Sequence, residues 1–599
     1  MRCSRSGRRH RFRTTPDARR REPRSDPLVP LASGPGPDEG ETRMTTTVAT
    51  APAARQAGRG MRLADRIIDR VWKLPPGGRY TVTLGLRAPM RDGIDLIGDL
   101  YTPADETPLG TILVRGPYGR TTLNSLAFAR VYAARGWQVL LQSVRGTFGS
   151  GGAFEPMRRE IEDGQDTVAW MRDQPWFIGS FATLGMSYLG FTQWALLMDP
   201  PPELAASVIV VGPHDFNRST HGIGSFSLAD FLGWSDMVAH QEDGSLTQRL
   251  LRERSTQRRQ RTAMDGIPLV AAGETLLAGQ APWYRDWAAR PDAADPFWKP
   301  MQLSAALDRV QTPVLLVGGW QDIFIRQTLD QWAHLRGRGL DVALTVGPWT
   351  HTDAAARGGG RVVKETLDFL GARLAGRPEG RPTPVRVHVT GADAGWRGSA
   401  DWPPPTSPRE LYLEPGRGLA ATASTQPAAP VTFTYDPTDP TPALGGPLLD
   451  GKTAGVVDNG PLESRDDVVT FTGEPLTRTL EVAGTVVVEL AHRSDNPHAD
   501  LFVRICDVDE RGRSFNVTDG FVRLTDADRD QVVRVELAGT AHRFGPGHRV
   551  RLQISGGAHP RLARNLGSGE PAATGSTLRP STRTLPVDGR SRVVLPVVG

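Results

Sequence analysis

The sequence has few features of an exported or disulfide-stabilised protein. It contains only two cysteines in 599 residues, Cys3 and Cys506, which lie far apart, so no disulfide framework is implied. The arginine pairs near the N-terminus are not followed by an apolar stretch of roughly 7 to 15 residues, which an export signal needs. We therefore expect a cytoplasmic protein.

The net charge of +5 comes from one short segment. Residues 1–43 contain eleven arginines against six acidic residues, and this difference accounts for the whole excess. The segment is rich in Arg, Pro, Gly and Ser, so we expect residues 1–60 to form a disordered basic tail, with no nucleic-acid or membrane partner. Translation that starts at Met44 or Met61 is an alternative explanation of the tail.

Ordered structure is expected from residue 61. The spacing of Leu63, Ile67, Ile68, Val71 and Trp72 predicts a short amphipathic helix, which the two prolines at 75–76 would end. Beyond it, short apolar runs at 111–114, 138–142, 182–184, 206–211, 313–317 and 342–346 alternate with helical patterns. This alternation predicts a mostly parallel sheet with helices on both sides, and ligands of such sheets bind beyond the carboxyl ends of the strands.

Two segments depart from this alternation. Residues 212–301 are helix-like and include several tryptophans, which predicts an inserted helical cap. From residue 381 to 599 short strands are separated by Pro and Gly turns, which predicts an all-β sandwich of jelly-roll type. The α/β core is therefore expected in two parts, at 61–211 and 302–380.

One predicted strand ends at a serine placed between glycines. Gly185 and Ser187 join an apolar strand-like run to a helix-like run that contains Gly190. A serine hydroxyl becomes a good nucleophile on a sharp turn beside a base, and such a turn needs small residues where strand and helix approach. The general motif has glycine two residues after the serine, where this chain has Leu189, so a tight turn without catalysis is the alternative. The position of Ser187 just beyond a strand end favours a nucleophile.

Two later strand ends supply the other residues that a serine nucleophile needs. One run leads into Asp322 and the next into His351, in the chain order expected for this sheet topology. Histidine would accept the serine proton, and the carboxylate would hold the imidazole in the right tautomer. We predict a Ser187–Asp322–His351 triad, with Asp330 and Asp353 as alternatives to Asp322.

Five motifs in order resemble the cocaine-esterase and X-prolyl dipeptidyl-peptidase-like hydrolases. The resemblance extends from about residue 80 to the C-terminus and implies an α/β-hydrolase fold with a helical cap and a C-terminal jelly roll. It also implies an oxyanion hole made by the Tyr188 backbone N–H and the Tyr118 hydroxyl. One departure is Ser143, where the family usually has an acidic residue; this substitution is expected to loosen an ion pair of Arg145. The motifs are Arg115-Gly116-Pro117-Tyr118, Val144-Arg145-Gly146, Gly185-Met186-Ser187-Tyr188-Leu189-Gly190, Gly319-Trp320-Gln321-Asp322 and Gly347-Pro348-Trp349-Thr350-His351.

The resemblance also bears on the substrate. Relatives that bind an ammonium group need carboxylates near the nucleophile, because a buried cation without a partner is costly. Amino-ester hydrolases of the family place acidic residues two and three positions after the triad aspartate, where this chain has Phe324 and Ile325, and residues 218–222 are also free of acid. Phe324 and Trp234 instead resemble the aromatic walls of the cocaine-esterase acyl pocket, with Met237 as a neighbour. Packing of Trp234 and Met237 within the cap is the alternative.

These observations predict a serine hydrolase that cleaves carboxylic esters through an acyl-enzyme on Ser187, without a metal or an organic cofactor. The expected partner is a small-molecule ester or a short peptide, and self-association into a homo-oligomer stays open. The alternative is an X-prolyl dipeptidyl-peptidase, an amidase or an α-amino-acid ester hydrolase with the same triad. A non-catalytic binding module is a third hypothesis. It is disfavoured because a scaffold gains nothing from Ser, Asp and His at three strand ends.

Overall fold

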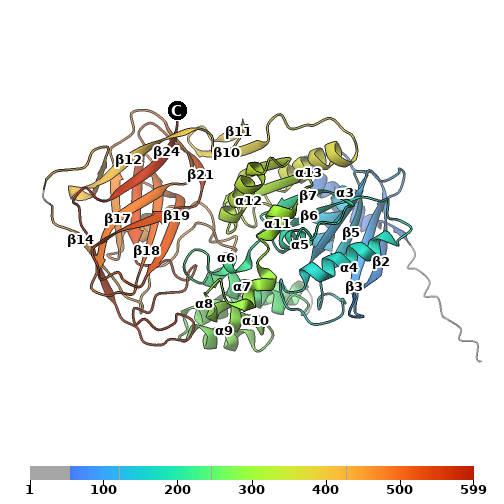
Figure 1. Cartoon of the computed structure of the whole chain (residues 1–599), viewed down its shortest axis with the longest axis horizontal. Coiled ribbons are helices and arrows are strands. Elements are labelled where there is room, and N and C mark those ends of the chain that lie inside the picture. The colour runs from blue at the N-terminus through green and yellow to red at the C-terminus, as the bar shows by residue number, and fades with distance from the viewer. Residues whose placement is uncertain (1–53, 121, 244–245, 427) are drawn as a thin grey trace, which may run out of the picture. The chain divides into compact units, whose positions relative to one another are not determined.

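The first part of the chain folds into a mostly parallel sheet (Figure 1). The computed structural model describes residues 54–120, 122–243, 246–426 and 428–599. The strands from β5 to β10 run parallel, and antiparallel strands flank them on both edges. The order across the sheet is β1 (Arg55–Gln56), β2 (Tyr80–Pro89), β3 (Asp95–Pro103), β5 (Gln138–Ser143), β4 (Thr111–Gly116), β6 (Phe181–Met186), β7 (Leu204–Val210), β8 (Val314–Gln321), β9 (Val342–Thr350), β10 (Val385–Gly391) and β11 (Gly395–Ser399).

The central strands form because their side chains are buried on both faces. Every residue of β4, β5 and β8 is buried, as their continuous apolar runs require. Helices pack against these strands; α5, for example, contacts β4, β6 and β7. The helices of this part are α2 (Thr122–Ser125), the π-helix η1 (Leu126–Arg130), α3 (Val131–Ala133), α4 (Glu160–Arg172), α5 (Tyr188–Leu196), α11 (Ala305–Arg309), α12 (Ile325–Gly337) and α13 (Gly359–Leu374).

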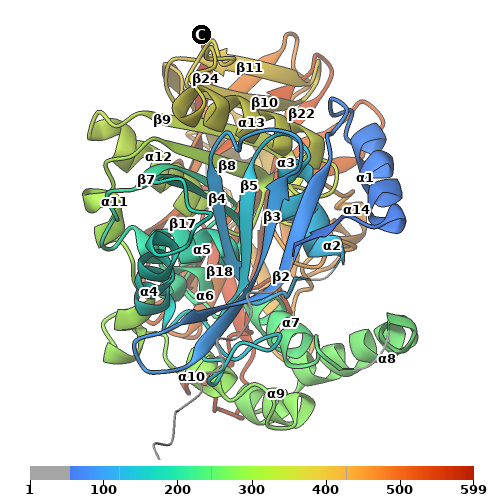
Figure 2. The same cartoon turned by 90° about the vertical axis from the view of Figure 1, so that its right-hand side faces the viewer.

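The segment between β7 and β8 is helical over the interval where a cap is expected. Aromatic rings hold it together: Phe216 packs against Trp287 with centroids 4.6 Å apart and against Phe231 at 5.2 Å. In Figure 2 these helices lie together at the lower end of the sheet, and α8 extends to one side. They are α6 (Phe216–Thr220), α7 (Leu228–Ala239), α8 (Leu246–Asp265), α9 (Leu269–Leu277), α10 (Trp283–Ala289) and the 3-10 helix η2 (Pro296–Met301).

The C-terminal part is built from strands that enclose a separate apolar core. Leu411, Phe471, Val488, Leu501 and Leu552 belong to this core. One series of paired strands runs β13, β15, β22, β18, β19, and another runs β12, β24, β17, β20. The jelly-roll order stays a prediction. The elements are β12 (Thr406–Glu414), η3 (Pro415–Arg417), β13 (Gly418–Ala420), β14 (Val431–Tyr435), α14 (Gly460–Glu463), β15 (Val468–Gly473), β16 (Leu480–Gly484), β17 (Val487–Ser494), β18 (Ala499–Val508), β19 (Ser514–Leu524), β20 (Gln531–Glu536), β21 (Thr540–Phe544), β22 (Arg549–Ser555), β23 (Ser581–Leu585) and β24 (Arg592–Val598).

The first strand after the boundary expected at residue 381 joins the core sheet. Strand β10, predicted to be the first strand of the sandwich, pairs in parallel with β9 and so extends the core sheet. Only its last residues, Thr390 and Gly391, pair with β21 of the C-terminal part. The residues of β10 alternate between buried and half-buried positions. A strand near the edge of the core sheet and a strand of a sandwich both show this alternation, so the sequence pattern could not tell which sheet the strand joins.

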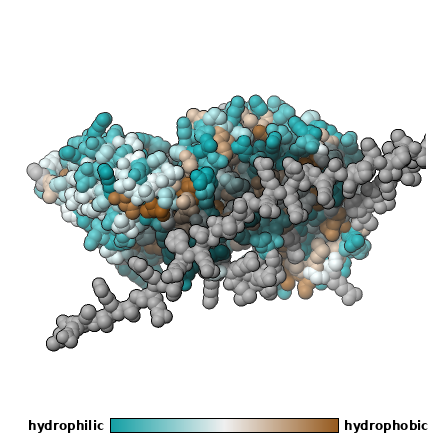
Figure 3. Space-filling view, turned by 90° about the horizontal axis from the view of Figure 1, so that it is seen from below, coloured by the Kyte–Doolittle hydropathy of each residue, from teal (hydrophilic) through white to brown (hydrophobic). Residues whose placement is uncertain are grey.

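The last residues of the predicted tail lie within the described part of the chain. Most of the predicted tail, residues 1–53, lies outside the described residues, but β1 pairs with β2 and helix α1 (Arg59–Val71) begins before residue 61. The expected helix is present. Ile68 and Trp72 are half-buried, but Leu63, Ile67 and Val71 are 57–65% exposed. The face shown in Figure 3 is largely hydrophilic, with small apolar patches. Within the described ranges, no helix is both long enough and apolar enough to cross a membrane.

Candidate active site

Ser187 occupies a strained turn between β6 and α5. Its φ of 60° and ψ of −120° place it in a region that non-glycine residues rarely adopt. Backbone hydrogen bonds fix the turn: the Ser187 N–H donates to the Val210 carbonyl at 2.9 Å, and its own carbonyl accepts from Gly190 and Phe191. This is the local geometry of a nucleophile elbow.

The glycines around the serine are required by close contacts. A Cβ at Gly185 would lie 2.4 Å from the Leu189 Cβ, and a Cβ at Gly190 would lie 2.6 Å from the Gly212 Cα. The Leu189 side chain packs over Gly116, where a Cβ would approach it to 2.4 Å. The general motif has glycine two residues after the serine, where this chain has Leu189. The structure has space for this leucine because residue 116 is a glycine, and the close approach to Gly212 requires glycine at position 190 instead.

Asp322 and His351 meet at the carboxyl ends of β8 and β9. The His351 Nδ1 lies 2.6 Å from the Asp322 Oδ1, and both side chains are buried. A carboxylate is an acceptor, so Nδ1 carries the proton and Nε2 is left to accept one. The second oxygen of Asp322 accepts the Phe324 backbone N–H at 3.1 Å, which holds the carboxylate in place.

The two alternatives to Asp322 lie elsewhere. Asp330 is exposed and pairs with Arg218, and Asp353 pairs with Arg357 at 3.4 Å. Of the three aspartates, Asp322 is the one that contacts His351.

Tyr118 follows β4 and carries a hydroxyl whose hydrogen-bond direction is constrained. The Trp234 indole N–H donates to this hydroxyl at 3.1 Å. The same hydroxyl is also hydrogen-bonded to the Ser187 side chain. Burial raises the pKa of Tyr118, which keeps the phenol protonated.

The predicted pocket residues have different surroundings. Trp234 is buried and stacks on Tyr188, with centroids 6.2 Å apart and planes 13° apart. The Phe324 ring meets the His351 ring edge-on at 5.3 Å. Met237, also on α7, is 48% exposed, whereas Trp234 is buried. Sequence reasoning missed Phe154, whose ring lies 6.2 Å from Tyr188, because its segment shows no motif.

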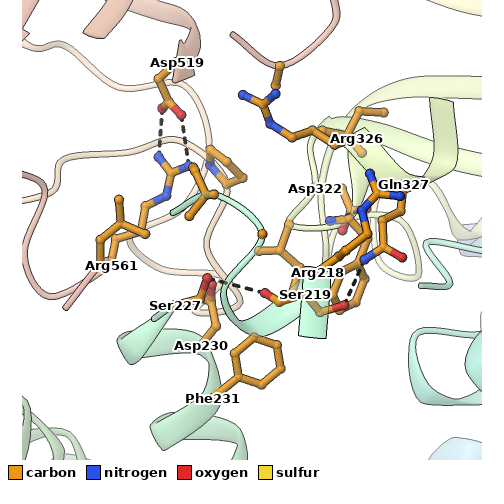
Figure 4. A pocket seen from close by; sticks show the side chains of 18 residues that line it. Arg218, Ser219, Ser227, Asp230, Phe231, Asp322, Arg326, Gln327, Asp519 and Arg561 are labelled. Carbon is orange, nitrogen blue, oxygen red and sulfur yellow. Dashed lines mark hydrogen bonds and ion pairs between the residues drawn. The ribbon is translucent and has the colours of Figure 1, made fainter. Parts of the chain in front are cut away.

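A cavity of about 90 Å³ adjoins Asp322 and Phe324 (Figure 4). Its lining comes from the cap, from the turn after β8 and from the C-terminal part, and it includes Asp230, Arg326 and Arg561. Asp230, on α7, is buried, and one of its oxygens accepts the Leu449 N–H at 2.8 Å. The sequence did not point to this carboxylate, because the positions considered for an acid were 218–222, 324 and 325.

Asp230 is expected to make the free energy of unfolding depend on pH. Burial raises its pKa from 3.8 to about 6, against the opposing hydrogen bond from Leu449. A raised carboxyl pKa means that ionisation disfavours the folded state, so the penalty is absent below about pH 4 and complete above about pH 7. We expect Asp230→Asn to raise the free energy of unfolding by about 1 to 3 kcal/mol at pH 8. Urea denaturation at pH 4 and pH 8 checks this; equal gains at both pH values would contradict it.

The expected loosening around Arg145 does not occur. Arg145 forms a two-pronged ion pair with Asp163, at 2.6 and 3.0 Å, and a further one with Asp92 at 2.6 Å. Ser143 instead accepts a hydrogen bond from Arg120. The two carboxylates that pair with Arg145 thus belong to helix α4 and to the turn before β3, and neither depends on the residue at position 143.

The sheet order and the turns at its carboxyl edge define the class of protein, an α/β-hydrolase-fold serine hydrolase. Family models agree: "X-Pro dipeptidyl-peptidase (S15 family)" matches residues 92–353, and "X-Pro dipeptidyl-peptidase C-terminal non-catalytic domain" matches residues 380–592. The chain is 31% identical over 552 residues to the cocaine esterase of Rhodococcus sp. (strain MB1 Bresler), covering 82% of this chain and 93% of that protein. It belongs to the family of cocaine-esterase and X-Pro dipeptidyl-peptidase-like hydrolases.

Solved structures share the fold over nearly the whole chain. An aminopeptidase from the marine sediment archaeon Thaumarchaeota archaeon superposes with a TM-score of 0.74 at 22% identity, covering 86% of this chain and 96% of that one. An α-amino acid ester hydrolase superposes with a TM-score of 0.74 at 21% identity, covering 93% and 100%. At these identities the likeness establishes the fold and leaves the substrate open.

Proposed function

We propose that the protein hydrolyses carboxylic esters through an acyl-enzyme on Ser187. The Ser187 oxygen attacks the ester carbonyl carbon while His351 Nε2 takes the hydroxyl proton, and Asp322 stabilises the imidazolium that forms. The hydrogen bond of 2.6 Å between His351 and Asp322 supports these roles.

The oxyanion of the tetrahedral intermediate would be held by the Tyr118 hydroxyl and the Tyr188 backbone N–H. Collapse of the intermediate breaks the bond to the alcohol oxygen, which leaves with the proton from His351. Water then attacks the acyl-enzyme, gives its proton to His351, and releases the acid as Ser187 regains its hydrogen. Donors already in place cost no reorganisation when the charge develops.

The preference for esters rests on one observation. Phe324, at a position where amino-ester hydrolases of the family have a carboxylate, lies edge-on to His351. An aromatic ring there favours an apolar acyl group and offers no partner to a substrate ammonium. Trp234 supports the same preference as a candidate pocket wall, since its ring stacks on Tyr188.

A panel of substrates tests the proposal. p-Nitrophenyl butyrate and benzoate are compared with Gly-Pro and Ala-Pro p-nitroanilides, using the wild-type enzyme and Ser187→Ala. We expect ester turnover that disappears in the variant, together with inert anilides. Cleavage of the anilides with a kcat/KM that matches the esters would contradict the ester preference, and activity retained by Ser187→Ala would contradict the mechanism.

Asp230 favours the second candidate, a peptidase or amino-ester hydrolase. It is a buried carboxylate beside Asp322 and Phe324, and a substrate ammonium could use it as a partner. The test compares kcat/KM for phenylalanine methyl ester with that for 3-phenylpropionate methyl ester, which lacks the amino group. A selective loss of the amino ester in Asp230→Asn would support this candidate, whereas an unchanged ratio would favour simple esters. The cytoplasmic location and self-association stay predictions.

A further inference from the structure

A buried ion pair contacts the residue that follows the nucleophile. Arg115, in β4, and Glu160, the first residue of α4, lie 3.1 Å apart, with side chains only 3% and 5% exposed. The other Glu160 oxygen accepts the Tyr188 hydroxyl at 2.7 Å. The carboxylate therefore joins a cation from one element to a phenol from another.

The Tyr188 side chain is fixed at its far end. Its hydroxyl donates to Glu160 and accepts the Met157 backbone N–H at 2.9 Å, and the residue is 1% exposed. Burial and the negative charge of Glu160 raise the pKa of Tyr188 well above its usual value, so the phenol remains a donor. The ring is also stacked on Trp234. A side chain held by a stacked ring and by two hydrogen bonds at its tip restricts the backbone from which it projects.

The same ion pair also includes a residue close in sequence to Tyr118, the other proposed donor of the oxyanion hole. Arg115 stands three residues before Tyr118, and its backbone carbonyl accepts the Thr192 hydroxyl of α5 at 3.2 Å. Its guanidinium is held further by Gln142 at 3.0 Å and by the Glu160 carbonyl at 3.3 Å. One buried pair thus ties the strand that leads to Tyr118 to the helix that begins with Tyr188.

We infer that Glu160 and Arg115 are positioning residues for the oxyanion hole, acting through the Tyr188 side chain and the end of β4. The inference rests on the proposed function. A buried ion pair is a poor source of stability, because desolvation offsets most of its attraction. Preorganised donors, in contrast, gain from being held rigidly where charge develops, and a displacement of about 1 Å can cost roughly 100-fold in rate.

Two variants weaken the contact, one from each side. Glu160→Gln removes the charge, and Tyr188→Phe removes one hydroxyl while keeping the ring. We expect each to lower kcat for p-nitrophenyl butyrate by about 10- to 100-fold, with KM within about twofold. The double variant should lose no more than the worse single variant, because both act through one hydrogen bond.

A matched control separates positioning from stability. Glu365 forms a buried pair with Arg381 at 2.6 Å, with exposures of 3% and 6%, and it has no contact with the predicted triad or donors among its hydrogen bonds and ion pairs in the described residues. Because Glu365 also pairs with Arg386 at 2.9 Å, we expect Glu365→Gln to lower Tm at least as much as Glu160→Gln does but to keep the wild-type kcat.

The outcomes distinguish this inference from the proposed function. The positioning role alone would be overturned by two results together: the wild-type enzyme hydrolyses esters in a way that depends on Ser187, and folded Tyr188→Phe has an unchanged kcat. A fall in kcat in Glu365→Gln equal to that in Glu160→Gln would also overturn it, since the effect would then be one of stability. An inactive wild-type enzyme would refute the proposed function first. Should Glu160→Gln fail to fold, Tyr188→Phe carries the test.

Discussion

Replacing Asp322 by Asn is expected to lower kcat for ester hydrolysis by about 10⁴-fold. Asp322 is the acceptor for the His351 Nδ1 proton at 2.6 Å. An asparagine can present its amide N–H to the imidazole, which would favour the tautomer that lacks a free acceptor at Nε2. The measurement is kcat for p-nitrophenyl butyrate, with circular dichroism to verify folding.

The two other aspartates provide matched controls for this substitution. Asp330→Asn and Asp353→Asn remove carboxylates that pair with Arg218 and Arg357 rather than with His351. We expect both variants to keep kcat within about twofold of wild type, because exposed or weakly paired charges contribute little. A large loss in either one, with Asp322→Asn active, would show that the triad acid has been assigned to the wrong residue.

Tyr118→Phe is expected to lower kcat by about 10²- to 10³-fold, with a smaller change in KM. The Tyr118 hydroxyl accepts the Trp234 N–H and is hydrogen-bonded to Ser187, so it lies where the oxyanion would develop. Removing the hydroxyl leaves the Tyr188 N–H as the remaining proposed donor. Steady-state kinetics on p-nitrophenyl butyrate and benzoate give the two constants separately.

Trp234→Phe tests the constraint on that hydroxyl. It keeps an aromatic ring against Tyr188 but removes the indole N–H, so the phenol is free to turn away from the oxyanion. We expect a fall in kcat of about tenfold, equivalent to one hydrogen bond of about 1.4 kcal/mol. If Tyr118→Phe retains the wild-type kcat, the oxyanion must be held by other donors, and the Trp234 contact has only a packing role.

Local patterns located most of the fold and the candidate residues. Mostly apolar runs predicted β4, β5 and β8, because strands buried on both faces consist largely of apolar residues. The small residues around Ser187 predicted a tight turn, and strand ends placed Asp322 and His351 at one edge of the sheet. Each of these features depends on a short stretch of chain, which is why one sequence sufficed.

The tertiary structure decided which distant atoms meet. The partner of β10, the exposed stripe on α1 and the ion pairs of Arg145 depend on segments far away in the chain, and no local period encodes them. The same holds for Asp230, whose burial is created by the cap and the C-terminal part together. By itself the sequence determined where strands end and which reactive side chains stand there. The contact of Glu160 with Tyr188 and the bond from Trp234 to Tyr118 arise only from packing, because side-chain hydrogen bonds between residues 28 and 116 positions apart are set by the folded backbone.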